Sequence, residues 1–180
     1  MDHDSEAIRA ILEAIRTRRS VRKFRQDPVS ATVVQSLLKA AIHAPSSGNS
    51  QPWHFVVVRN QEVTRKLAEA ALGQAFLAMA PVVIVVCADL GRAMTAYGPR
   101  GVNLYCLQDT AAAGQNLMLA AHALGFASCW VGAFDEKQVA RALELADSHR
   151  PVALIALGKP ADSPEMPERL PMEQVLRVIE

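Results

Sequence analysis

The stretch PVVIVVCA, residues 81–88, decides which fold this chain can adopt. Five of its eight residues are Val or Ile, and none of the eight is charged. A strand with one face in solvent alternates apolar and polar residues, whereas a strand covered on both faces is apolar throughout. The run therefore predicts a central β-strand with other elements packed against both of its faces.

Three further segments have the composition of strands. They are short, apolar runs with several β-branched or aromatic residues, bounded by turn-forming residues: WHFVVV at 53–58, FASCWVG at 126–132 and PVALIALG at 151–158. Together with the central run they predict a sheet whose strands come from distant parts of the chain.

Helical periodicity separates these strands, with apolar residues three or four positions apart. The predicted helices cover residues 5–16, Ser30 to Pro45 with Ser30 as N-cap, 61–72 after Asn60, 104–124 with Gly125 as C-cap, and 135–146. The first two elements of the chain are both helical, and no strand precedes them. We therefore expect an α+β fold of three layers, not a doubly wound nucleotide-binding fold.

Two segments lack such a pattern. Residues 91–104, GRAMTAYGPRGVNL, contain three Gly and one Pro and are expected to be irregular. The tail KPADSPEMPERLP (159–171) is rich in Pro, and it leads to an amphipathic segment, MEQVLRVI. A tail of this kind does not pack as one compact element, so residues of about 160–180 are expected to form an arm along a partner subunit.

Length and composition limit the class of protein. The chain has 180 residues, 51% of them hydrophobic and 21% charged, which is typical of one globular domain over residues 1–180. Its formal net charge of +1 argues against a protein that binds nucleic acid or a membrane surface over its whole area. No apolar run is long enough to span a membrane, and MDHDSEAIRA is not a signal peptide. A cytoplasmic location is therefore expected.

The cysteines and histidines give no sign of a metal or redox site. Cys87, Cys106 and Cys129 lie in apolar surroundings with no CxxC pair, which predicts buried free thiols. None of the five histidines pairs with a Cys or an acidic residue in a recognisable arrangement. The sequence thus predicts no metal site and indicates no catalytic acid or base.

The stretch RTRRSVRKFR, residues 16–25, concentrates six of the 19 basic residues. One interpretation is a solvated charged face. The other is an anion site, because in an extended segment Arg18, Ser20 and Arg22 point to one side while Val21 packs into the core. Guanidinium groups and a hydroxyl suit phosphate oxygens, and one row of this length fits a compact phosphate ligand better than a duplex.

A second polar stretch is APSSGNSQPWHFVVV, residues 44–58. Its Ser46, Ser47, Asn49 and Gln51 lie on a loop between a predicted helix and a predicted strand. Such loops are most often simple turns. Amide and hydroxyl groups at this density can also hydrogen-bond a polar heterocycle or a ribityl chain.

Taken together, these stretches resemble the nitroreductase family of FMN-dependent enzymes. The resemblance begins with RRSVRKF and APSSGNSQPWHFVVV. It continues in the family's order through GQAFLAMAPVVIVV, DTAAAGQNLMLAAHALGFASCWVGAFD and PVALIALGKPADSPEMPERLPMEQVL. It implies a three-layer α-β-α fold with a mixed, mainly antiparallel sheet. It also implies an intertwined homodimer with two FMN molecules at the interface.

The resemblance also implies roles for individual residues. Arg18, Arg19, Ser20 and Arg22 would bind the FMN phosphate, ribityl chain and pyrimidine edge, and Arg169 would return to the phosphate, with Lys159 a weaker candidate. Pro45, Ser46, Ser47 and Asn49 would reach the isoalloxazine of the other subunit's flavin. Gln74 would contact the flavin edge, and Gly132 and Ala133 would present backbone N–H groups to it. Tyr97, Arg100, Asn103 and Tyr105 are candidates for the mouth of the pocket.

The expected activity is hydride transfer from NADH or NADPH, through FMN, to nitroaromatics, quinones, flavins or related acceptors by a ping-pong mechanism. Two other functions remain open from the sequence. One is a protein that binds FMN for storage, sensing or delivery without useful turnover. The other is a small nucleic-acid binder that uses residues 16–25.

Overall fold

Four antiparallel strands lie at the centre of the computed structural model, which describes residues 2–180. They are β1 (Trp53–Val58), β2 (Val82–Asp89), β3 (Ala127–Val131) and β4 (His149–Gly158), in the order β1-β2-β4-β3. Every residue of β2 from Val82 to Ala88 is fully buried. The prediction of a central strand covered on both faces is confirmed.

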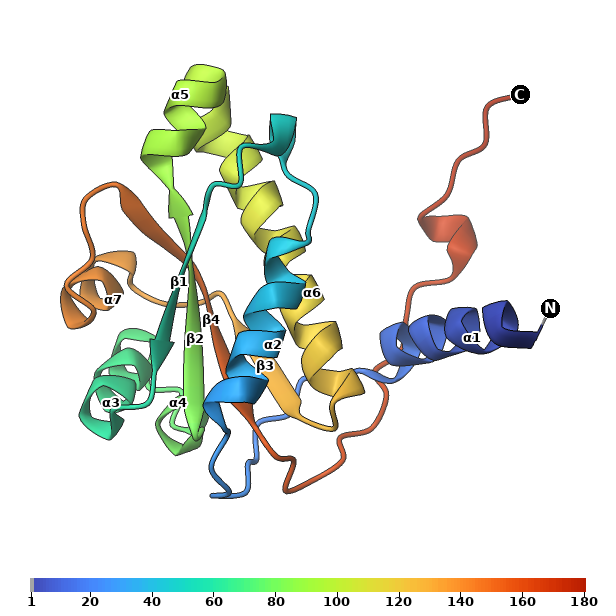
Figure 1. The fold of residues 1–180 in the computed structure, drawn as a ribbon, viewed down its shortest axis with the longest axis horizontal. Helices are drawn as coiled ribbons and strands as arrows, with labels where there is room; N and C mark the ends of the chain where they lie inside the picture. The colour runs from blue at the N-terminus through green and yellow to red at the C-terminus, as the bar shows by residue number, and fades with distance from the viewer. Residues whose placement is uncertain (1) are drawn as a thin grey trace.

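Helices cover both faces of this sheet (Figure 1). On one face lie α3 (Gln61–Ala70), α4 (Phe76–Met79) and α7 (Glu136–Ala142), and on the other lie α2 (Ala31–Ile42) and α6 (Cys106–Ala123). Alternate residues of β2 point into two separate hydrophobic layers, Val83 and Val85 into one, Ile84 and Val86 into the other. The α+β three-layer prediction is confirmed.

The predicted helix boundaries match the capping chemistry. The Ser30 hydroxyl accepts a hydrogen bond from the Val33 amide at 3.2 Å, and the Asn60 carboxamide accepts from the Glu62 amide at 2.9 Å. Each satisfies backbone N–H groups that have no partner inside the helix. Gly125 follows α6 with φ of +71°, the left-handed conformation expected at this position.

The prediction that residues 91–104 are irregular is wrong. They form α5 (Leu90–Arg100) and a π-helical turn, η2 (Gly101–Tyr105). Asp89 starts α5 by accepting a hydrogen bond from the Arg92 amide at 3.0 Å, a cap that the sequence reading overlooked. The helical backbone is interrupted at Tyr97 and Gly98, and the φ of 56° and ψ of −144° at Gly98 are accessible essentially only to glycine.

The basic stretch continues the sheet at its edge. Ser20 makes an isolated parallel bridge with Ser128 of β3, and the Val21 amide donates to the Ser128 carbonyl at 3.1 Å. Val21 is buried, as the extended interpretation predicted, and Phe24 is buried as well. The four named strands are all antiparallel, so this single bridge is the parallel component of the mixed sheet.

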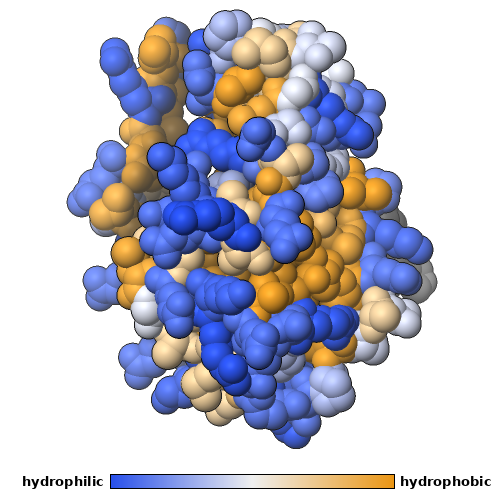
Figure 2. All heavy atoms as spheres, turned by 90° about the vertical axis from the view of Figure 1, so that its left-hand side faces the viewer, coloured by the Kyte–Doolittle hydropathy of each residue, from blue (hydrophilic) through white to orange (hydrophobic). Residues whose placement is uncertain are grey.

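Helix α1 (Asp2–Thr17) and the tail project together from the same side of the body (Figure 1). The amphipathic segment at the end of the chain forms only a short 3-10 turn, η3 (Met172–Gln174). Both segments expose large apolar side chains in the single chain. On the face that carries α3 and α7, polar side chains predominate and several apolar areas lie between them (Figure 2).

Candidate functional site

A hollow of about 350 Å³ lies between the basic stretch and the tail. The tail side of its lining consists of Pro164, Glu165, Pro167 and Arg169. The other side consists of four residues that the sequence singled out: Arg18, Arg19, Ser20 and Arg22. The structure therefore brings together five candidate residues from opposite ends of the chain.

The four guanidinium groups around this hollow outnumber its one carboxylate, Glu165, and none of them is paired with it. Among the described residues, Arg18, Arg19, Arg22 and Arg169 form no ion pair. Partial burial lowers the pKa of Arg18, and the like charges of Arg169 and Arg19 lower it further. Such an accumulation of positive charge is stabilised by a bound anion.

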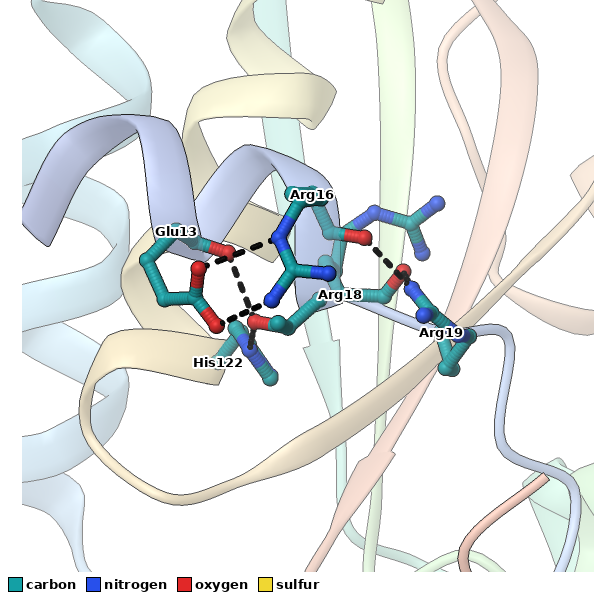
Figure 3. Close-up of polar contacts among 6 residues, drawn as sticks. Glu13, Arg16, Arg18, Arg19 and His122 are labelled. Carbon is teal, nitrogen blue, oxygen red and sulfur yellow. Dashed lines mark hydrogen bonds and ion pairs between the residues drawn. The ribbon is translucent and has the colours of Figure 1, made fainter. Parts of the chain in front are cut away.

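Hydrogen bonds to the backbone fix part of this cluster (Figure 3). Arg19 Nη1 donates to the carbonyl oxygens of Arg16 at 2.7 Å and Arg18 at 2.9 Å. The Arg18 side chain points away from the Glu13–Arg16 pair. The Arg22 guanidinium lies 5.8 Å from the ring centre of Phe76, a contact between α4 and the basic stretch.

The other basic residues of the neighbourhood have partners of their own. Lys23 and Arg25 make exposed ion pairs with Asp162 at 3.7 Å and with Asp27 at 2.6 Å. Lys159 Nζ donates to the Gly125 carbonyl at 3.2 Å and lies over the Phe126 ring. Lys159, the weaker phosphate candidate, is thus directed to the end of α6 and does not line the hollow.

His122 supports the basic stretch from α6. The Thr17 hydroxyl donates its proton to the Glu13 carbonyl at 2.7 Å, so it accepts from His122 Nε2, 2.8 Å away. This bond assigns a proton to Nε2. Partial burial lowers the pKa of His122, and so do the nearby positive charges of Arg18 and Arg19. The contact with Thr17 gives His122 a structural role at the end of α1.

Gln74 and Ala133 form a second group of candidates. Gln74 Nε2 donates to the Ala71 carbonyl at 3.0 Å and to the Ala133 carbonyl at 3.3 Å. Gly132 and Ala133 are exposed at the end of β3, next to Gln74. Because Phe76 follows Gln74 closely and lies under Arg22, this group adjoins the arginine cluster.

The remaining candidates, Pro45, Ser46, Ser47 and Asn49, lie elsewhere. Figure 1 shows η1 (Ser47–Asn49) beside α5 at the upper end of the molecule, whereas the basic stretch runs through the lower half. Asp109, at the start of α6, accepts hydrogen bonds from the Ser47 amide at 3.1 Å and from its hydroxyl at 3.2 Å. One chain therefore does not bring all twelve candidates into one site.

Three of the four predicted mouth residues meet next to this loop. Arg100 Nε donates to the Tyr105 hydroxyl at 2.7 Å, and Tyr97 packs edge-on against Tyr105 with ring centres 5.3 Å apart. The Tyr97 hydroxyl also lies directly against Gly48. Asn103 is exposed.

Sequence reasoning missed two residues of these clusters. Phe76 occurs in an apolar run, and nothing there indicates that it faces an arginine. Asp109 gave a stronger signal, because it is a carboxylate at the start of the otherwise apolar helical segment DTAAAGQNLMLAA. A buried charge is expected to have a specific partner.

Other classes of site find no support in the described residues. Cys87, Cys106 and Cys129 are free and buried, as predicted, and burial raises the pKa of Cys87 to about 12. Among residues 6–180, whose side chains the structure describes, no three His, Cys, Asp or Glu side chains form a cluster able to hold a metal ion. No helix in the part of the chain that the structure describes is long and apolar enough to cross a membrane.

Comparison with known proteins identifies the family. The sequence profile of the nitroreductase family matches residues 15–76 and 71–159. The chain belongs to the nitroreductase family. A relative named as an NADH dehydrogenase from Thermus thermophilus is 36% identical over 186 residues, which cover 88% of this chain and 91% of the relative.

Solved structures of other nitroreductase-like proteins share the fold. A nitroreductase family protein from Streptococcus pneumoniae superimposes with a TM-score of 0.85 at 28% identity, covering 93% of this chain and 99% of that one. An NADPH:FMN oxidoreductase from Vibrio harveyi, solved with NAD+, superimposes with a TM-score of 0.87 at 28% identity. That match covers 95% of this chain and 77% of the Vibrio chain. The nitroreductase fold predicted from the sequence is confirmed.

Proposed function

We propose that this nitroreductase-family chain is an FMN-dependent oxidoreductase. Its expected reaction is hydride transfer from NADH or NADPH to nitroaromatics, quinones, flavins or related acceptors by a ping-pong mechanism. The names of its relatives support NAD(P)H-dependent oxidoreduction. The observation that carries the proposal is the hollow formed by Arg18, Arg19, Ser20, Arg22 and Arg169.

The residues around this hollow fit the phosphate of FMN. Four guanidinium groups supply planar pairs of N–H donors, and Ser20 supplies a short neutral donor. They lack carboxylate partners among the described residues, so a phosphate would neutralise charge that the chain leaves uncompensated. Charge-assisted hydrogen bonds of this kind contribute about 1.5–3 kcal/mol each. Compact phosphate recognition accounts for the basic stretch better than nucleic-acid binding, which needs a longer positive surface.

The other candidates would orient the flavin. Bound FMN supplies the two-electron redox chemistry, and the protein supplies binding, orientation and electrostatics. Gln74 would hold the flavin edge, with the backbone N–H groups of Gly132 and Ala133 as neighbouring donors. Arg22 would place positive charge near the pyrimidine edge, where it favours the anionic reduced form. No acid or base from this chain is needed for these tasks.

We further propose that the site is completed by a second copy of the chain. The loop with Pro45, Ser46, Ser47 and Asn49 lies away from the arginine hollow of its own chain. Two copies that exchange these loops would each complete the other's site. The exposed apolar faces of α1 and of the tail are the surfaces that such a homodimer would bury.

Anaerobic titration of the purified protein tests the proposal. We expect a yellow protein whose absorbance near the flavin maximum is bleached by NADH or NADPH and restored by a nitroaromatic or a quinone. Bound FMN that neither nucleotide reduces would instead support the storage or sensing function. A colourless protein that does not take up FMN, and binds oligonucleotides with steep salt dependence, would overturn both.

A further inference from the structure

The loop between α2 and β1 has an unusual backbone. Gly48, Asn49 and Gln51 have φ of 53°, 56° and 48°, in the left-handed region that residues with a side chain seldom adopt. The loop is short and has no regular strand or α-helix of its own. Contacts from outside must therefore hold it in this conformation.

Asp109 of α6 makes two hydrogen bonds to this loop. Only 6% of this residue is exposed, and its Oδ1 accepts from both the amide and the hydroxyl of Ser47. A second bond inside the loop runs from the Gln51 amide to Ser46 Oγ at 3.0 Å. The carboxylate thus fixes Ser47, the first residue of η1, and Ser46 fixes Gln51, the second residue beyond the end of η1.

The packing of α6 alone does not explain a carboxylate here. The buried positions on the same side of the helix, four, eight and twelve residues further on, are the apolar Ala113, Leu117 and Ala121. Asp109 Oδ2 is buried too, and it has no hydrogen-bond partner among the described residues. A buried carboxylate with an unpaired oxygen lowers stability, and the hydrogen bonds that offset this cost at Asp109 both come from Ser47.

Helix α5 contacts the same loop through two other side chains. Arg92 Nη1 donates to the Gln51 carbonyl at 3.3 Å, and the Tyr97 hydroxyl lies against Gly48. A Cβ at Gly48 would overlap with that hydroxyl. The loop is therefore held between a carboxylate from α6 and two side chains from α5.

We propose that Asp109 is a positioning residue for the oxidoreductase reaction. It acts through Ser47 and holds residues 45–49 in the one conformation that can contact the flavin bound by the partner copy. The inference rests on the proposed function, because that function places Pro45, Ser46, Ser47 and Asn49 at the flavin. Asp109 itself does not touch the reacting groups.

Three variants of the full-length protein test this role. Asp109→Ala removes both bonds to Ser47. Asp109→Asn keeps an oxygen that can accept both. Thr110→Val is the matched control, because the Thr110 hydroxyl is equally buried in α6 but donates at 2.7 Å to Cys106 of the same helix.

Two readouts separate positioning from general stability. One is hydrogen exchange of a peptide covering residues 44–53 in the protein as purified. The other is FMN release on dilution, followed by the recovery of flavin fluorescence. We expect Asp109→Ala to speed exchange in this peptide and to weaken FMN binding at least tenfold, with Asp109→Asn and Thr110→Val both within threefold of the parent.

The opposite results would overturn the inference. Unchanged loop exchange and FMN affinity in Asp109→Ala would do so, and so would an equal loss of FMN in Thr110→Val. If Asp109→Ala does not fold, Ser47→Ala replaces it; this variant loses the hydroxyl bond to Asp109 and should speed exchange in the peptide covering residues 44–53, and unchanged exchange would contradict the role. A parent protein that binds no FMN would refute the proposed function, while the exchange data would still decide whether Asp109 holds the loop.

Discussion

Arg18 and Arg22 differ from the basic residues at the end of the same stretch because their guanidinium groups form no ion pair among the described residues. They line the hollow without a carboxylate partner, whereas Lys23 and Arg25 are paired with aspartates at the surface. We expect the double variant Arg18→Ala, Arg22→Ala to be purified colourless, because it loses two of the phosphate donors. The absorbance ratio between the flavin band and the protein band measures this.

The control for this prediction is the double variant Lys23→Ala, Arg25→Ala. It removes the same net charge from the same segment, but exposed ion pairs contribute little to stability. This control should stay yellow. A fully yellow Arg18→Ala, Arg22→Ala protein would show that the phosphate lies elsewhere.

His122 links the basic stretch to the pH dependence of stability. Its pKa in the folded protein is lowered, so the unfolded chain binds the proton more readily, with an ordinary pKa of about 6.5. Stability contributed by the neutral imidazole is therefore present above about pH 6.5 and is lost as the pH falls through the lowered value. The melting temperature should drop between pH 7.5 and pH 5.5.

The variant His122→Gln tests this assignment, because its carboxamide can still donate to Thr17 but does not titrate. Its melting temperature should fall less than that of the parent over the same pH range. Replacement of the exposed His43 by Gln serves as the control and should leave the pH profile of the parent unchanged. Equal profiles for the parent and His122→Gln would contradict the role assigned to His122.

At the scale of elements, the break between α5 and η2 depends on Gly98. A side chain at this position would meet no atom within 4 Å, so Gly98→Ala introduces backbone strain without a clash. Strain of this kind costs about 1–3 kcal/mol. We expect urea unfolding to show a loss in that range. Gly91→Ala, in the first turn of the same helix, needs no unusual backbone conformation and places its Cβ 3.3 Å from Asp89 Oδ1, so it should cost less than Gly98→Ala, and an equal loss there would contradict the explanation.

The strands and helices that the sequence predicts are those marked by a local pattern of burial or capping. β2 was predictable because burial on both faces leaves an unbroken apolar run, and α2 and α3 because Ser30 and Asn60 mark their first turns. The sequence does not predict α5, because the three Gly and one Pro of residues 91–104 are typical of a loop. In the structure only one residue there, Gly98, requires glycine's conformational freedom.

The candidate site was predictable residue by residue, but its arrangement was not. Local alternation predicts that Arg18, Ser20 and Arg22 share a side, and the resemblance to the family adds Arg19 and Arg169. No local pattern shows that the tail returns to the basic stretch, because that contact is set by the packing of distant elements. The contact between Asp109 and Ser47 has the same origin.

The single domain over residues 1–180 and the cytoplasmic location remain predictions.

At the scale of the whole molecule, the exposed apolar faces predict a homodimer. Ile11 and Leu12 of α1 are 62% and 61% exposed, and Ile179 of the tail is 82% exposed. Burial of such faces contributes roughly 25 cal/mol per Å² of apolar area. Sedimentation equilibrium should therefore give the mass of two chains, and Ile11→Glu combined with Leu12→Glu should give one chain and weaken FMN binding. Leu72→Asn, at an equally exposed position with positive φ, should remain dimeric. A parent protein that sediments as one chain while holding FMN would show that one copy suffices for the site.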